Sequence, residues 1–122
     1  MAEIQPKIVG LTETRVDDGR ELYDFFIVDG EYVEKAYKSI RDRLIITNKR
    51  LIIIDIQGVI GRKKEYMVIP YSKISAFSCE SAGTFDIDSE FKVWVSGVGC
   101  IEFGFIKSNV KPLVQILSKY TI

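Results

Sequence analysis

The stretch that decides the fold is RDRLIITNKRLIIIDIQGVIGRKKEYMVIP, residues Arg41–Pro70. It contains three apolar runs of four residues or fewer, Leu44–Ile46, Leu51–Ile54 and Tyr66–Ile69. The β-branched residues Ile and Val dominate these runs, which favours strands over helices. The joints between the runs are short, and the second joint contains two glycines. This spacing predicts an antiparallel meander.

Further strands are predicted on both sides of the meander. Glu31–Ile40 precedes it, and Ile74–Glu80 follows it after Pro70. Residues 90–96 and 100–105 then alternate between apolar and polar side chains around the turn Gly97-Val98-Gly99. Two strands of period two that flank a glycine-rich turn predict a β-hairpin.

A short helix is predicted in the N-terminal part of the chain. Residues 1–16 show no firm period, but Leu22, Phe25 and Phe26 follow the spacing i, i+3, i+4. Asp18 is suited to cap this helix, with Glu21 completing a capping box. We therefore interpret residues 1–30 as a lead-in with a short helix, and residues 31–122 as the main domain.

The C-terminal segment changes to a helical period. Ser108 or Asn109 can cap a helix there, and Pro112 is tolerated in its first turn. One apolar stripe follows at helical spacing: Val110, Leu113, Val114, Leu117 and Tyr120. An amphipathic helix of this kind packs its stripe against a sheet. Seven strands and this helix predict a mainly β fold, a bent antiparallel sheet closed by the helix.

Length and composition indicate one soluble globular domain. The 122 residues are 47% hydrophobic and 28% charged, with 17 basic and 17 acidic residues. The charge is segregated, because residues 1–34 carry nine acids and three bases, whereas residues 35–73 carry three acids and ten bases. This polarity suits head-to-tail self-complementation or the steering of an anionic ligand. Basic side chains that protect solvated strand edges are the plainer interpretation.

The sequence also bears on the compartment. Cys79 and Cys100 are isolated and outside any CxxC pattern, as expected for small thiols in a reducing environment. The sequence shows no run of about 18 apolar residues and no signal-peptide core. We therefore expect a cytoplasmic protein.

Two stretches carry a resemblance to a known family. They are IRDRLIITNKRLIIIDIQGVIGRKKEYMVIPYSKISAFS, residues 40–78, and ESAGTFDIDSEFKVWVSG, residues 80–97. Together with the closing hairpin and helix, this pattern resembles the bacterial pleckstrin-homology (PH) domain proteins over about residues 30–122. The resemblance implies a seven-stranded antiparallel bent barrel capped by the C-terminal helix, without an established catalytic activity. It also implies a homo-oligomer with a ring arrangement.

Basic residues form the first candidate site. In eukaryotic PH domains, a spaced Lys/Arg pattern at the first strand junction contacts inositol phosphates, and Lys38, Arg41 and Arg43 resemble that pattern. Convergent Lys and Arg donors suit phosphate. Lys49 and Arg50, with Arg62–Lys64, would extend the patch if the loops converge. The alternative interpretation is a solvated basic edge, since Asp42 lies inside the pattern.

Trp94 is the candidate interface residue. It falls between Lys92 and Ser96 on the polar face of its strand, where a large aromatic side chain requires a cover. A subunit interface would cover it, and so would a loop or the N-terminal helix of the same chain.

Other chemistries have little support in the sequence. The motif of Asp86, Asp88 and Glu90 lacks the glycine and the final glutamate of a calcium loop, so no metal or cofactor is predicted. The chain contains no histidine and therefore no Ser–His or Cys–His pair, and no catalytic residue is predicted. Zero net charge and the lack of an RNA-binding motif disfavour nucleic acid. We expect a non-enzymatic, self-associating scaffold, with anionic-membrane or phosphate binding as the alternative.

Overall fold

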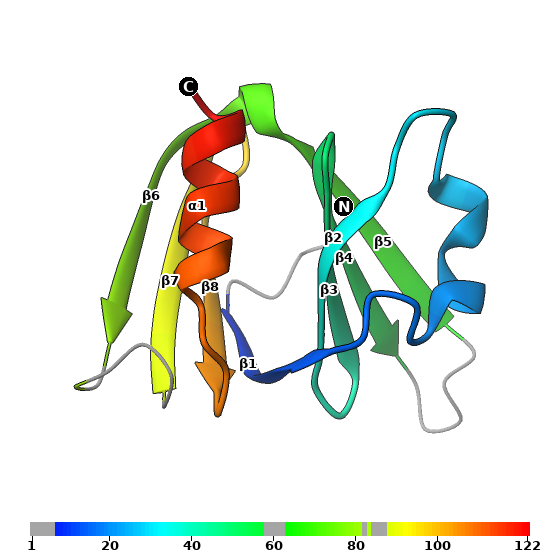
Figure 1. The fold of residues 1–122 in the computed structure, drawn as a ribbon, viewed down its shortest axis with the longest axis horizontal. Helices are drawn as coiled ribbons and strands as arrows, with labels where there is room; N and C mark the ends of the chain where they lie inside the picture. Colours follow the sequence, from blue (N-terminus) through cyan, green and yellow to red (C-terminus); the bar gives the residue numbers. More distant parts are fainter. Residues whose placement is uncertain (1–6, 58–62, 82, 84–87) are drawn as a thin grey trace.

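The computed structural model describes residues 7–57, 63–81, 83 and 88–122. Within them the chain forms one open sheet of eight strands and one α-helix, in the order β5-β4-β3-β2-β1-β8-β7-β6 across the sheet (Figure 1). The strands are β1 (Lys7–Thr14), β2 (Val33–Lys38), β3 (Asp42–Thr47), β4 (Arg50–Gln57), β5 (Lys63–Pro70), β6 (Ile74–Ser81), β7 (Asp88–Val95) and β8 (Gly99–Ile106). The helix is α1 (Lys111–Tyr120), and short 3₁₀ turns occur at η1 (Arg20–Leu22), η2 (Asp24–Phe26) and η3 (Tyr71–Lys73).

The seven predicted strands are all present, and β1 is an eighth that the sequence did not reveal. β1 pairs antiparallel with β2 and parallel with β8, so it joins the two halves of the sheet. Its register shifts between Ile8 and Leu11, where Gly10 has a φ of 75°. The buried side chains of Ile8 and Leu11 are therefore three residues apart instead of two. This spacing interrupts the alternation by which a strand is recognised in a sequence. β1 lies in the same sheet as the strands that follow residue 30.

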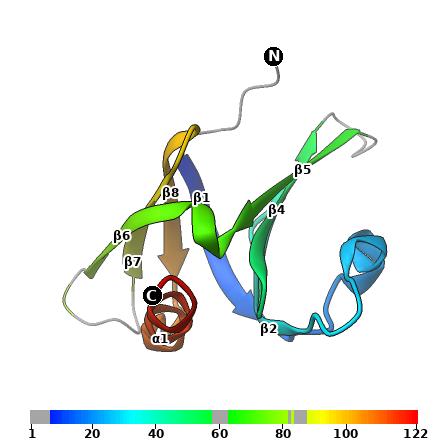
Figure 2. The ribbon, with the colours of Figure 1, turned by 90° about the horizontal axis from the view of Figure 1, so that it is seen from above.

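The main core lies between the two halves of the sheet and under α1. Its largest fully buried side chains come from strands on both halves, with Tyr37 edge-on to Phe105 at a ring distance of 4.9 Å. α1 contributes Leu113, Ile116 and Leu117. Figure 2 shows α1 end-on beside β7 and β8, as the apolar stripe predicts.

The start of α1 agrees in part with the predicted caps. The Oδ1 atom of Asn109 accepts the Lys111 N–H at 3.1 Å, and Pro112 lies in the first turn. Ser108 instead accepts the N–H of Glu13 at 2.9 Å and thereby ties the helix start to β1. The residue at the N-cap position is Val110, whose side chain is fully buried.

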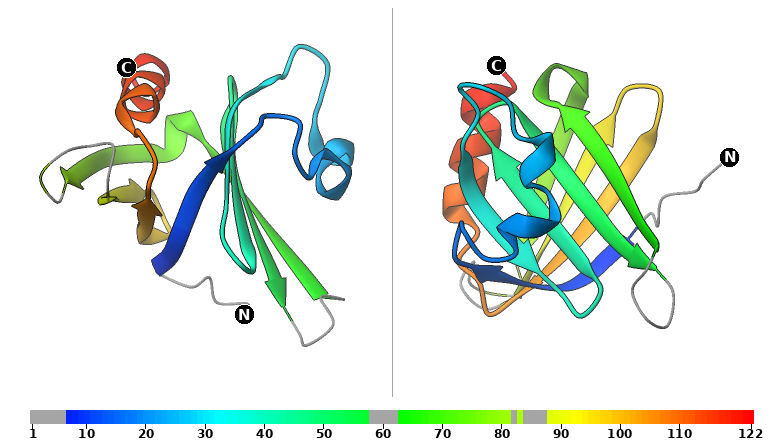
Figure 3. Two further views of the ribbon diagram at one scale, coloured as in Figure 1. Left: turned by 60° about the horizontal axis from the view of Figure 1, so that its bottom comes forward. Right: turned by 90° about the vertical axis from the view of Figure 1, so that its right-hand side faces the viewer.

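A second apolar cluster lies on the opposite side of β2–β5. Residues 15–32, which we call the lobe, cover this outer face (Figure 3, right). Tyr23 from the lobe packs with Ala36, Ile45, Ile52 and Ile54, and all five side chains are fully buried. β3 and β4 are thus apolar on both faces, which explains why their runs are continuous rather than alternating.

The predicted helix from Asp18 is wrong. The segment forms the two 3₁₀ turns η1 and η2, and the N-cap position of η1 is Gly19 in the left-handed conformation (φ 69°). Asp18 therefore lies one residue before the N-cap position, and its carboxylate pairs with Arg43. Phe26 packs on the outer face of β2–β5, whereas Phe25 is 74% exposed. Turns this short are set by their contacts with the sheet rather than by helical propensity.

Candidate functional site

Arg50, one of the predicted phosphate ligands, is committed to an internal ion pair. Its Nε lies 2.8 Å and its Nη2 2.9 Å from the two carboxylate oxygens of Glu31. The Nη2 also donates to the carbonyl of Phe26, and the Thr47 hydroxyl donates to Glu31 at 2.7 Å. The Glu31 side chain has no exposed surface, and that of Arg50 is 20% exposed. This arrangement fixes the lobe to β4.

The hydrogen bonds decide the charge state of this pair. Burial alone would raise the pKa of Glu31, but the bonds from Arg50, from Thr47 and from the Val28 N–H outweigh it. The pKa of Glu31 is therefore lowered, and its hydrogen bond raises the pKa of Arg50. Both groups stay charged at neutral pH, as expected of a bidentate pair.

Lys38 and Arg43 both face Asp18. The Arg43 guanidinium lies 2.9 Å from the Asp18 carboxylate, and the Lys38 ammonium lies 3.7 Å from it. Arg43 also donates to the Asp18 carbonyl at 3.2 Å. The hydrogen bond from Arg43 lowers the pKa of Asp18. Asp18 of the acidic N-terminal segment thus pairs with Lys38 and Arg43, two of the residues that the sequence predicted to bind a ligand.

The five predicted basic residues do not form one patch. Lys38, Arg41 and Arg43 lie around the β2–β3 turn, whereas Lys49 and Arg50 lie around the β3–β4 turn. These turns are at opposite ends of β3, which separates them by roughly 20 Å. Arg41 lies beside the end of β4, since its carbonyl accepts the Ile56 N–H. Arg62 lies outside the described residues.

Carboxylates share the end of the sheet that holds Arg41. Asp42 is directly opposite Asp55, and Asp55 is directly opposite Glu65. Burial, followed by the charge of Asp55, raises the pKa of Asp42. This end is therefore mixed in charge rather than basic.

Trp94 lies on an uncovered face. Its cross-strand neighbours are Ala76 on β6 and Cys100 on β8, both small. Its side chain is 37% exposed. The lobe lies over the other half of the sheet and leaves this one open (Figure 2). We call the outward side of β6–β8 and of the start of β1 the bare face.

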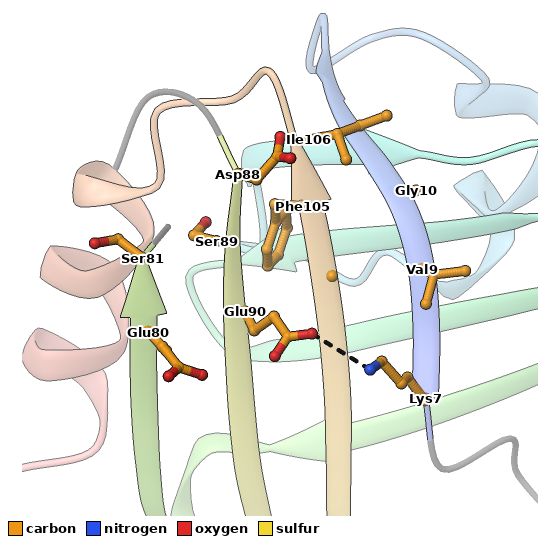
Figure 4. Close-up of a pocket in the computed structure, with 11 residues that line it drawn as sticks. Lys7, Val9, Gly10, Glu80, Ser81, Asp88, Ser89, Glu90, Phe105 and Ile106 are labelled. Atoms are coloured by element: carbon orange, nitrogen blue, oxygen red, sulfur yellow. Dashed lines mark ion pairs between the residues drawn. The ribbon is translucent and has the colours of Figure 1, made fainter. Parts of the chain in front are cut away.

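A groove crosses the bare face next to the charged ends of β6 and β7 (Figure 4). Its volume is about 430 Å³, and Gly104 leaves its floor without a side chain. Val9 lines one side and Glu80 the other, while Glu90 reaches Lys7 at 3.3 Å. The sequence pointed to Asp88 and Glu90 only as an incomplete metal motif, and Asp86 lies outside the described residues. Alternation placed Glu90 outward, but only the register brings Glu80 beside it.

Other chemistry is sparse in the part of the chain that is described. It contains no group of three Cys, Asp or Glu side chains placed to hold a metal ion. Cys79 and Cys100 are free thiols on opposite faces of the sheet, and burial raises the pKa of Cys79. Among these residues, no helix combines the length and the apolar character that a bilayer crossing requires.

Two proteins of known sequence are similar to more than half of this chain. The sequence is 54% identical over 71 residues to the uncharacterized protein YjqA of Bacillus subtilis (strain 168), and 36% identical over 76 residues to its uncharacterized protein YozO. The matches cover 58% and 62% of this chain, and they span 57% and 65% of the lengths of those relatives.

Solved structures are similar over most of the chain. A protein with a pleckstrin-homology domain from Shewanella loihica PV-4 matches with a TM-score of 0.80 and 34% identity, covering 93% of this chain and 99% of that one. A pleckstrin-homology domain from Shewanella amazonensis SB2B has a TM-score of 0.68 and 35% identity, covering 91% of each chain. The family profile described as "Bacterial PH domain" matches residues 4–121. The chain therefore belongs to the bacterial PH domain family.

Proposed function

We propose that this chain is a non-catalytic interaction module that self-associates and acts as a scaffold. The observation that carries the proposal is the exposed indole of Trp94 on a sheet face that the lobe leaves open. Large aromatic side chains are enriched at protein interfaces and often dominate their energetics. The small neighbours Ala76 and Cys100 leave room for a partner surface to contact the ring.

The charge segregation contributes less to assembly than the sequence suggests. Much of it is neutralised within the protomer, where Asp18 pairs with Arg43, and Glu31 with Arg50. Lys35 likewise pairs with Glu13 at 2.8 Å. We therefore expect self-association to depend on apolar contact and to weaken only modestly with salt. A heterologous contact through the part of the bare face around Trp94 would suit the ring that the family resemblance implies.

Size-exclusion chromatography with multi-angle light scattering tests the proposal. The expected result is a discrete multiple of 13.9 kDa at micromolar concentration, which Trp94→Ala reduces to the monomer mass. Phe25→Ala is the matched control, since it removes an exposed aromatic side chain from the covered half and is expected to leave the mass unchanged. A monomeric wild-type protein, or an oligomer that Trp94→Ala leaves intact, would contradict the proposal.

Peripheral binding of anionic headgroups is the second candidate. The observation in its favour is that Arg41 and Lys64 both adjoin Ile56, which gathers basic residues at one end of β3–β5. The carboxylates of Asp18 and Asp42 at the same end weaken the attraction of a phosphate. This candidate predicts salt-sensitive sedimentation with phosphatidylglycerol vesicles, reduced when Lys38, Arg41 and Arg43 become Ala. A lack of sedimentation at low salt would exclude it.

A further inference from the structure

The groove on the bare face combines an apolar floor with an acidic wall. Val9 is 59% exposed and Ile106 is 39% exposed, and both line it. Gly104 lies between Val9 and Glu90, so no side chain fills the space between them. Its volume of about 430 Å³ falls in the lower part of the range of small-ligand sites, ~300–1,000 Å³.

The acidic wall contains a like-charged pair. Glu80 on β6 is directly opposite Glu90 on β7, an arrangement that destabilises a sheet unless a cation lies nearby. Lys7 forms an ion pair with Glu90 at 3.3 Å (Figure 4). No ion pair to Glu80 or Asp88 occurs among the described residues, so negative charge remains on this wall.

The occupant that fits both features is a side chain with an aliphatic stem and a cationic head. The stem would lie over Gly104 against Val9, and the head would reach the carboxylates of Glu80 and Glu90. Long basic side chains combine these properties, and a guanidinium bonds carboxylates in a fixed geometry. An anionic ligand would meet repulsion from the same wall.

We propose that the groove binds an extended peptide segment of a partner protein through an arginine side chain. This site differs from the contact around Trp94, which lies further along β7. The peptide is therefore expected to bind a protomer whether or not it self-associates.

Fluorescence anisotropy with a fluorescein-labelled Val-Arg-Val peptide tests this inference. The isosteric Val-citrulline-Val peptide, which lacks the charge, is the matched probe and is expected to bind at least about fivefold more weakly. Equal binding of the two peptides, or no binding of the arginine peptide at millimolar protein concentration, would overturn the proposal.

Variants locate the site. Gly104→Val fills the floor and is expected to abolish binding. A Cβ at this position meets Val9 Cα at an ordinary 3.6 Å, and circular dichroism of the variant checks that the sheet is kept. Glu80→Gln is expected to weaken binding about fivefold, whereas Glu102→Gln, on the same face but outside the groove, is expected to leave it unchanged. Wild-type affinity in Gly104→Val, or equal losses in Glu80→Gln and Glu102→Gln, would contradict this location.

One further variant separates this site from self-association. Trp94→Ala leaves the groove residues in place, so its affinity for the arginine peptide is expected to equal that of the wild type. Loss of peptide binding in that variant would place the peptide on the Trp94 contact instead and overturn a separate groove site.

Discussion

The two halves of the sheet are built from the same kind of strand but differ in how they are covered. β2–β5 are covered on both sides, by the main core within and by the lobe outside. β6–β8 are covered only within, and their outward side chains face solvent. A lobe of 18 residues thus turns one half into an interior layer and leaves the other half open to solvent.

The difference is visible in the residues themselves. Ile52 on β4 points outward and is fully buried, whereas Lys92 and Trp94 on β7 point outward and are exposed. An outward side chain is therefore buried against the lobe in one half and exposed to solvent in the other. Substitutions in the covered half should change stability, and substitutions on the bare face should change binding.

The largest effect is expected where the lobe is fixed to the sheet. Glu31→Gln removes the charge that Arg50 faces in a buried site, so the free energy of unfolding should fall by about 3 kcal/mol at neutral pH. Urea denaturation followed by circular dichroism measures this loss.

The same pair predicts a pH dependence. The pKa of Glu31 is lowered in the folded state, so its stabilisation is full above the ordinary value of 4.5 and is lost as the pH falls through the lowered pKa. The difference in unfolding free energy between wild type and Glu31→Gln should therefore become smaller in acid. A difference in unfolding free energy that does not change with pH would contradict an ionised Glu31–Arg50 pair.

A matched pair of substitutions compares the two outward faces. Ile52→Thr places a hydroxyl in the covered half and should cost about 2–3 kcal/mol of unfolding free energy. Lys92→Thr replaces an exposed, outward side chain in the other half and should lower the free energy of unfolding by less than about 0.5 kcal/mol. Similar losses in thermal or urea unfolding would remove the contrast between the halves.

The rim of the lobe should matter less than its centre. Phe25 is 74% exposed, and its ring lies 4.8 Å from that of Phe26 and 5.6 Å from that of Tyr66. Phe25→Ala should therefore cost only about 1 kcal/mol, the loss of those ring contacts. A loss as large as that of Ile52→Thr in the same urea experiment would show that the covered half extends further outward than its burial indicates.

The smallest effect is expected at the carboxylate pair. Asp42→Asn should stabilise the protein by about 0.5 kcal/mol at neutral pH, because it removes a solvent-screened repulsion from Asp55. The pKa of Asp42 is raised in the folded state, so the gain should grow as the pH rises above 3.8 and vanish below it. Destabilisation by Asp42→Asn at neutral pH would show that the carboxylate is needed there.

The elements that depend on local pattern were predicted well. Alternation along residues 90–105 fixed the β7–β8 hairpin and placed Trp94 outward, and the helical stripe located α1. β1 was missed because the irregularity at Gly10 interrupts its period. The lobe helix was wrong because its residues form turns that conform to the sheet beneath them.

The site residues were harder to predict, because their partners are distant in sequence. Glu31 and Arg50 are 19 residues apart, and Asp18 and Arg43 are 25 apart. A run of basic residues does not reveal which of them will be neutralised within the fold. Glu80 and Glu90 likewise form one wall only through the β6–β7 register.

The emission spectrum of Trp94 tests the central claim most directly, since it is the single tryptophan of the chain. If the bare face is the contact surface, the emission should shift to shorter wavelength as protein concentration rises through the range in which light scattering detects assembly. An emission maximum that stays constant while the mass increases would show that the protein assembles through another surface.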